Sequence, residues 1–365
     1  MTTDMFTVER RMEDDPVRSD SVSPLTPVVV EDTLDDMSED TLKEAPDDLR
    51  PSSGPVPVDS GNGAEGPAAV AVCSQTNGRS NNEDSYFVQT LPIGGDAPAV
   101  LLALSDGMGG HDFGEHASRE TLRKLALLLF EQFAILPRLN GEGSVPTSEE
   151  IGRAMVSMMP LVSAHVQRIA EMNGWNRSGA TLVAAVVVGD TAAVINVGDS
   201  PAYHVRPDGG MVVHLTEDHS LAGMLLKANL ITAEMARVHE GRCQLEHYIG
   251  GPNLPNEMPV RTLTLVPGDY LVLCSDGVSN SFPEEAVLGN LLTSAGGAVA
   301  DAATELVVHA RRSGEHDNQT VIVYRHGLRP GTPLMTVIPD MGPVNPHPSD
   351  FPDNVPSPPL AEVRA

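Results

Sequence analysis

The chain has 365 residues, of which 41% are hydrophobic and 20% charged, and its formal net charge at pH 7 is −27. The hydrophobic fraction is sufficient for one large folded core or two ordinary ones. The negative charge argues against nucleic acid or an anionic membrane as a partner, because both would repel the chain. It is compatible with divalent cations.

Cysteine spacing and the length of apolar runs indicate the cellular compartment of the protein. The three cysteines, Cys73, Cys243 and Cys274, are far apart and form no CxxC pair, which predicts small thiols in a reduced compartment. The longest apolar run, "TLVAAVVVG", has the length of a strand, and acidic residues from Asp4 onward do not resemble a secretory signal. We therefore expect a cytoplasmic protein that does not bind membranes.

Composition divides the chain into three parts. Residues 1–65 carry seventeen acidic side chains against five basic ones, and residues 328–365 include ten prolines. Neither segment has enough apolar surface to offset the entropy that folding would cost. The sequence predicts a disordered acidic tail over 1–66, a folded domain over 67–327 and a disordered Pro-rich tail over 328–365.

Strand-like and helix-like segments alternate through the folded domain. Apolar residues at helical spacing predict helices over 115–136 and 148–172, and adjoining strand pairs such as 181–188 and 192–199 favour antiparallel pairing. The pattern predicts an α+β fold, a four-layer α-β-β-α sandwich of two antiparallel sheets flanked by helices. The expected strands cover 68–75, 84–91, 99–105, 181–188, 192–199, 202–206, 211–216, 269–275 and 318–325.

Acidic residues stand at the ends of several of these strands. An apolar strand runs into Ser-Asp-Gly twice, at Asp106 and at Asp276, while Asn-Glu-Asp and Asp-Asn precede two other strands. Each of these short sequences, such as Asp-Gly or Asp-Asn, is by itself typical of an ordinary turn. The repetition favours one shared site, and clustered carboxylates need cations to neutralise their repulsion. Hard oxygen ligands favour magnesium or manganese. The acidic residues concerned are Glu83, Asp84, Asp106, Asp276 and Asp317.

Six motifs occur in the order known from one protein family. "GRSNNEDSYF", "DGMGGHDFGEHAS", "VGDS", "LTEDHS", "PGDYLVLCSDGVSN" and "DNQTVIVY" lie between about residues 70 and 325. Together they resemble metal-dependent Ser/Thr protein phosphatases of the protein phosphatase 2C (PPM) type, in a bacterial-like branch. The resemblance implies hydrolysis of phosphoserine and phosphothreonine in proteins, with two Mn²⁺ or Mg²⁺ ions per active site.

The resemblance also implies a role for each matching acidic residue. Asp106 would bridge the two ions. The carbonyl of Gly107 and the side chain of Glu83 would serve one ion. Asp276 and Asp317 would hold the other ion. Asp106, Asp276 and Asp317 would thus form the catalytic set, in which a hydroxide that bridges the ions attacks phosphorus.

Further residues would support this set. Asp84 and Asn318 would lie behind the metal ligands, and Arg79 would bind the substrate phosphate through its planar guanidinium. Asn176 stands where some relatives have an aspartate, so a third ion would bind weakly. Pro201 follows "VGDS" where the family usually has arginine, and Asp199 is interpreted as a turn residue.

Two other functions remain open alternatives. One is a catalytically weakened relative that acts as a regulatory or binding module, and the other is a small-molecule phosphohydrolase. The expected partners are a phosphoprotein substrate and a Ser/Thr kinase or the targets of that kinase. We expect a monomer.

Overall fold

The computed structural model describes most of the predicted domain. It covers residues 67–93, 98–109, 113–135, 145–175, 178–206, 210–282, 285–327 and 329–341. All of these lie in one structural unit, Asp59–Ala365. The predicted tail over 1–66 lies outside the described residues, as does the stretch from 342 onward, so disorder there stays a prediction.

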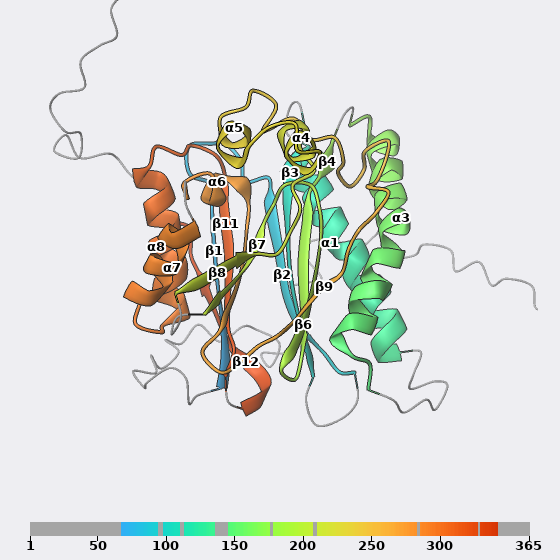
Figure 1. Cartoon of the computed structure of the whole chain (residues 1–365). Coiled ribbons are helices and arrows are strands. Elements are labelled where there is room, and N and C mark those ends of the chain that lie inside the picture. The colour runs from blue at the N-terminus through green and yellow to red at the C-terminus, as the bar shows by residue number, and fades with distance from the viewer. Residues whose placement is uncertain are drawn as a thin grey trace, which may run out of the picture. The chain divides into compact units, whose positions relative to one another are not determined.

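Twelve strands of the described chain pair into two sheets (Figure 1). The first sheet has the strand order β12-β1-β11-β10-β7-β8, and the second has the order β2-β3-β5-β6-β9 with β4 attached to β3. The strands are β1 (Pro67–Gln75), β2 (Asp84–Leu91), β3 (Ala99–Met108), β4 (Gly179–Ala180), β5 (Leu182–Val188), β6 (Thr191–Val197), β7 (Ala202–Arg206), β8 (Met211–His214), β9 (Arg261–Thr264), β10 (Tyr270–Cys274), β11 (Gln319–Arg325) and β12 (Arg329–Ile338).

The longest described helix has clear sequence signals at both ends. The helix α3 (Ser148–Asn173) starts after Thr147, whose side chain and that of Glu150 form a reciprocal capping box, and it ends at Gly174 with φ of 71°. In the described part of the chain, no helix is both long and apolar enough to cross a membrane. The remaining helices are α1 (Gly114–Phe130) with a π-helical turn (Glu131–Ile135), α4 (Leu221–Lys227), α5 (Ala233–Arg237), α6 (Asp276–Ser279), α7 (Glu285–Ser294) and α8 (Val299–Arg312).

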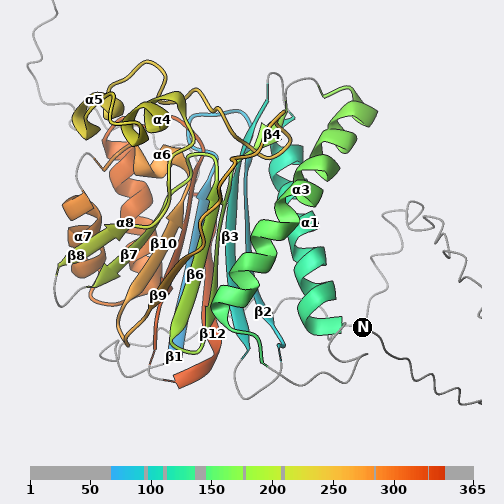
Figure 2. The same cartoon turned by 45° about the vertical axis from the view of Figure 1, so that its right-hand side comes forward.

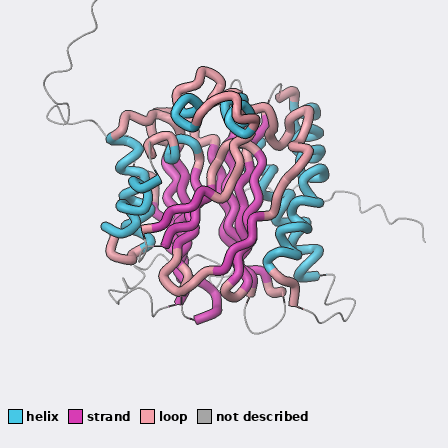
Figure 3. Tube along the Cα trace, viewed as in Figure 1, coloured by secondary structure: helices cyan, strands magenta, loops and turns pink. Residues whose placement is uncertain are grey.

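Three apolar cores join the elements into four layers. One core lies between the sheets and includes Leu102 and Ile322. A second packs α1 and α3 on the outer face of the β2–β9 sheet, and a third packs α7 and α8 on the outer face of the other sheet. The views in Figures 2 and 3 show the strands in the middle with helices on both flanks. The predicted four-layer α-β-β-α sandwich is confirmed.

The C-terminal boundary differs from the prediction. We expected disorder from residue 328 onward, but residues 329–338 form β12, which pairs in parallel with β1 over Pro67–Cys73. Every other strand pair described is antiparallel. The Pro-rich composition wrongly predicted disorder here. Prolines can occupy an edge strand, because the outward-facing N–H groups of such a strand form no hydrogen bonds within the sheet. The sheet therefore extends to residue 338.

Candidate active site

The predicted acidic residues come together at one end of the sandwich. Asp84 on β2 lies opposite Asp106 on β3 in the strand register, whereas Asp276 begins α6 directly after β10 and Asp317 lies just before β11. The two sheets thus contribute to one cavity of about 400 Å³. It is lined by Arg79, Glu83, Asp106, Gly107, Met108, Gly109, Thr181, Asp199, Cys243, Leu245, Asp276, Asp317 and Asn318.

Backbone contacts fix the end of β3. The amide of Asp106 donates to Thr181 Oγ1 at 2.9 Å, and the amide of Thr181 donates back to the Asp106 carbonyl at 2.8 Å. The amide of Gly107 donates to the Glu83 carbonyl at 3.1 Å. A Cβ atom at Gly107 would overlap the backbone of Gly114, so only glycine allows the chain to pass here.

The second Asp-Gly turn is packed just as closely. A Cβ atom on Gly277 would overlap the carbonyl of Asn318. Beneath this turn, Ser275 Oγ donates to Asp84 Oδ2 at 2.8 Å and accepts from the amide of Thr320 at 3.0 Å. Ser275 therefore joins the two sheets directly below the acidic cluster.

Asn318 holds the segment that carries Glu83. Its side-chain amide donates to the carbonyls of Thr76 and Asn81, both at 2.9 Å, and its Oδ1 accepts from the amide of Glu83 at 2.9 Å. Asn318 is buried. A single amide side chain thus fixes the chain between β1 and β2 against the start of β11.

Arg79 reaches across the cavity rim to a predicted metal ligand. Its Nη2 lies 2.6 Å from Asp317 Oδ2, and its side chain is 56% exposed. Burial by itself would lower the pKa of Arg79, but the proximity of Asp317 and hydrogen bonding to it, with smaller effects from Glu83 and Asp276, raise that pKa above its usual value. The guanidinium keeps its positive charge at the mouth of an otherwise acidic cavity.

Burial and crowding raise the pKa of the clustered carboxyls. Burial first, and the nearby Asp84 and Asp276 next, raise the pKa of Asp106 well above its usual value. Burial and neighbouring Asp317 raise the pKa of Asp276 to about 6. Burial raises the pKa of Asp84 to about 7 and also raises that of Glu83. These carboxylates are costly to ionise together without a counter-charge.

The donor types around the cavity suit a divalent cation. Carboxylate and carbonyl oxygens are the ligands that Mg²⁺ and Mn²⁺ prefer. Asp84 is not among the lining residues of the cavity, but its buried Oδ1 has no hydrogen-bond partner within the described residues. In this part of the chain no three Asp, Glu, His or Cys side chains converge into a ready-made ion site. Asp317 forms an ion pair with Arg79, while the side chains of Asp276 and Asp106 are close enough to hydrogen-bond. A bound cation would neutralise the charge of these carboxylates.

One further acidic residue lines the cavity. Asp199, which we interpreted as a turn residue, lies in a bend of the chain and also lines the cavity, where burial and the nearby Asp276 and Asp218 raise its pKa well above the usual value. It follows the apolar strand β6 in the way that Asp276 follows β10. Cys243 also lines the cavity. Asn176, the predicted weak third ligand, lies outside the described residues.

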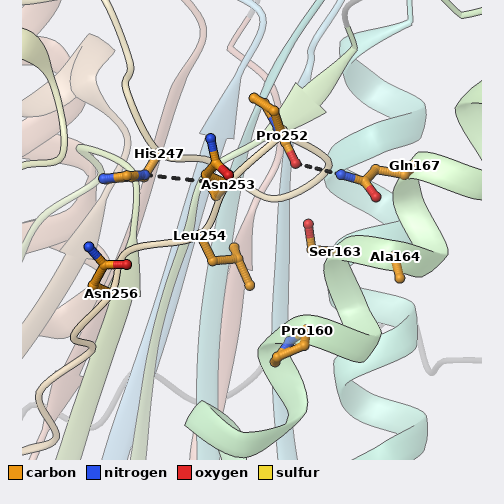
Figure 4. A pocket seen from close by; sticks show the side chains of 10 residues that line it. Pro160, Ser163, Ala164, Gln167, His247, Pro252, Asn253, Leu254 and Asn256 are labelled. Atoms are coloured by element: carbon orange, nitrogen blue, oxygen red, sulfur yellow. Dashed lines mark hydrogen bonds between the residues drawn. The ribbon is translucent and has the colours of Figure 1, made fainter.

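A second hollow lies away from the acidic cluster. It has a volume of about 500 Å³ and lies between α3 and the segment 247–256 (Figure 4). Ser163, Gln167 and Asn253 are among its lining residues, which include no carboxylate and none of the predicted site residues. The chemistry expected of the acidic cluster therefore belongs to the smaller cavity.

Comparison with known proteins places the chain among phosphatases. A sequence profile of the family described as Protein phosphatase 2C matches residues 74–303. The serine/threonine protein phosphatase PstP of Mycobacterium tuberculosis is 31% identical over 245 residues, a match that covers 67% of this chain and 42% of PstP. The serine/threonine phosphatase stp of Listeria monocytogenes is 32% identical over 257 residues, which cover 68% of this chain and 92% of stp.

Solved structures give the same result. The crystal structure of M. tuberculosis PstP superposes with a TM-score of 0.57 at 28% identity, covering 71% of this chain and 99% of that one. The serine/threonine phosphatase of S. agalactiae gives a TM-score of 0.60 at 30% identity with the same coverage. A PstP catalytic domain in complex with two manganese ions gives 0.54 at 28% identity, over 71% of this chain and 97% of that one. From its sequence, its fold and its acidic cavity, the chain belongs to the protein phosphatase 2C family.

Proposed function

We propose that this protein hydrolyses phosphoserine and phosphothreonine in other proteins. The observation that carries the proposal is the single cavity in which acidic residues of both sheets surround a site next to Arg79. Relatives in Mycobacterium and Listeria are named serine/threonine phosphatases. Two divalent ions fit the donors, and a related catalytic domain has two manganese ions.

We assign the two ions to the residues that surround the cavity. Asp106 would be shared by both ions. Glu83 and the Gly107 carbonyl would serve one ion, while Asp276 and Asp317 would serve the other. When bound, the ions supply a water of lowered pKa and offset charge on the phosphoryl oxygens. The weak third ion predicted at Asn176 stays a prediction.

The chain's own residues bind and orient the substrate. The exposed guanidinium of Arg79 can engage two phosphate oxygens. A substrate phosphate would replace the Asp317 carboxylate as the partner of Arg79, which would free Asp317 to bind an ion. Asn318 and Asp84 hold the surrounding chain through their hydrogen bonds to Glu83 and Ser275.

One assay tests the proposal. Phosphate release is measured with Mn²⁺ and without it, from a phosphothreonine peptide and from p-nitrophenyl phosphate. We expect Mn²⁺-dependent release from the peptide, abolished in Asp276→Ala. No release from either substrate would favour a regulatory binding module. Release from the small ester alone would favour a small-molecule phosphohydrolase.

We further infer a place in signalling inside the cytoplasm. A Ser/Thr kinase that phosphorylates the same targets would supply the substrate, because the reaction consumes a phosphate ester that only phosphoryl transfer provides. Cys73, Cys243 and Cys274 are all free thiols, which is typical of reducing compartments. Size-exclusion chromatography with light scattering would test the expected monomer.

A further inference from the structure

The end of β12 lies beside the segment that leads to Arg79. Strands β1 and β12 run parallel at the edge of the first sheet, with Cys73 opposite Ile338. The chain leaves β1 at Gln75 and reaches Arg79 four residues later. Residues 339–341, which directly follow β12, are therefore neighbours of the turn that carries the phosphate-binding arginine.

The side chain of Gln75 connects these two segments. Gln75 is completely buried. Its Nε2 donates to the carbonyl of Pro339 at 3.0 Å, and its Oε1 accepts from the amide of Met341 at 2.6 Å. Oε1 also accepts from Arg311 Nη2 of α8 at 3.0 Å. Both ends of the Gln75 amide thus form a hydrogen bond with the backbone that follows β12.

The next residue, Thr76, is held from two sides. Its amide donates to Asp340 Oδ2 at 3.3 Å, and its carbonyl accepts from Asn318 Nδ2 at 2.9 Å. The same carbonyl also accepts from the amide of Arg79 at 3.3 Å, which closes the turn. The contact with Asn318 belongs to the acidic site, whereas the contact with Asp340 comes from beyond β12.

We propose that residues 339–341 form an anchor that positions Arg79 to bind the substrate phosphate. The anchor lies beyond residue 303, where the match to the family profile ends. Without it, Thr76 would keep the contacts of its carbonyl with Asn318 and the Arg79 amide but lose the contact of its own amide with Asp340, and the guanidinium would be ordered less tightly before the substrate arrives. This assignment deepens the proposed phosphatase function and rests on it.

The anchor acts on phosphate binding more than on the chemical step. Strands β1 and β11 separate β12 from β10, which leads into Asp276. Asp106 lies on the other sheet. A change at the end of β12 therefore reaches Arg79 first, and a positioning role of this kind raises KM while leaving kcat nearly unchanged.

The test uses full-length Met341→Pro with Met341→Ala as its matched control. Both variants lose the exposed methionine side chain, but only proline also loses the N–H that donates to Gln75. With a phosphothreonine peptide and Mn²⁺, we expect Met341→Pro to raise KM about three- to tenfold, with kcat changed less than about twofold. Met341→Ala should match the wild type.

The Arg79→Ala background separates positioning from general loosening of the fold. If the anchor acts through Arg79, Met341→Pro has no further effect on KM once Arg79→Ala is present. Equal KM values for the two Met341 variants, or a full effect in the Arg79→Ala background, would overturn the proposal. Should Met341→Pro fail to fold, Asp340→Ala, which removes the acceptor for the Thr76 amide, takes its place with the same expectations.

A calorimetric titration with inorganic phosphate keeps this test independent of turnover. If the wild type released phosphate from no substrate, the proposed function would fail. Weaker phosphate binding by Met341→Pro than by Met341→Ala would then still support the anchor, and equal binding by both would refute it.

Discussion

Asp84 and Asp106 lie directly opposite each other on the neighbouring antiparallel strands β2 and β3. Asp84 is buried and Asp106 is half-buried, both lie near Asp276, and each has a raised pKa. Like charges at such short range are unfavourable unless protons or cations neutralise them. The register of this one strand pair therefore produces much of the charge repulsion that a metal ion would relieve.

Replacing Asp106 by asparagine should separate metal binding from folding. Asp106→Asn removes a carboxyl that is unfavourable to ionise beside Asp84 and Asp276, so the free energy of unfolding without metal should not decrease. The variant loses the carboxylate that both ions would share, so Mn²⁺ affinity should fall at least about tenfold and peptide phosphatase activity about 100-fold or more. Calorimetric Mn²⁺ titration and urea denaturation measure the two effects.

The matched control for that variant is Asp301→Asn. Asp301 is exposed in the first turn of α8, so its replacement should leave Mn²⁺ uptake unchanged. Wild-type Mn²⁺ affinity in Asp106→Asn would contradict the assignment of Asp106 as the shared ligand.

Arg79 should contribute mainly to substrate binding. Arg79→Ala removes the guanidinium at the cavity mouth, and we expect KM for a phosphothreonine peptide to rise about tenfold or more. Arg79→Lys keeps the charge without the planar pair of donors, so its KM should lie between those of the wild type and Arg79→Ala. Steady-state kinetics at saturating Mn²⁺ measure this order, and a KM for Arg79→Lys equal to that of Arg79→Ala would show that charge alone has no effect.

Gly277 should tolerate no side chain. Because a Cβ atom there would overlap the Asn318 carbonyl, Gly277→Ala should lower the free energy of unfolding by about 2–3 kcal/mol. In Gly289→Ala the new Cβ meets only the Cγ2 of Val212 at 3.0 Å, within the helix α7, so the change should be small. Urea denaturation of both variants checks the contrast; similar losses of stability in the two would mean that the turn can relax.

His219 should make the fold sensitive to mild acid. Its Nδ1 accepts a hydrogen bond from the Gly198 amide at 3.1 Å, and burial, followed by the nearby His247, lowers the pKa of His219 from 6.5 to about 4. In the unfolded chain His219 therefore binds a proton near pH 6.5, whereas in the folded chain it binds that proton only near pH 4. Stability is fully present above pH 6.5 and decreases as the pH falls through this window, by on the order of 3 kcal/mol.

The variant His219→Asn isolates this contribution. Asparagine keeps an acceptor for the Gly198 amide but does not titrate, so its unfolding free energy should depend less on pH between 6.5 and 4. Unfolding curves measured at several pH values give the comparison. Parallel pH profiles for the wild type and His219→Asn would refute the assignment.

Much of the cavity was predictable because its acidic residues interrupt apolar runs. A strand such as β10 can be recognised by its run of apolar residues. A carboxylate that directly follows such a strand must lie where the strands of the sheet end. Asp276 follows β10, Asp317 precedes β11 and Asp106 lies near the end of β3, so the ends of these strands bring the three carboxylates to one cavity. Their roles as metal ligands remain proposals.

Other features depend on contacts that sequence patterns do not contain. β12 carries two prolines within a Pro-rich tail, and only its pairing with β1 reveals it as a strand. Pro201 stands two residues after Asp199, where the family usually has arginine, and nothing in this local pattern shows that Asp199 lies near Asp276. In both cases the position of the segment is determined by its tertiary neighbours, which the local sequence does not reveal.

The origin of the acidic side chains in two different layers has a mechanical consequence. Asp106 comes from one sheet and Asp276 follows a strand of the other, and between these sheets lies an apolar core. An ion held by both residues would connect the two sheets at this end of the sandwich. Amide hydrogens of β3 and β10 would then exchange more slowly with solvent in the loaded protein, because the layers could separate only after the ion had left.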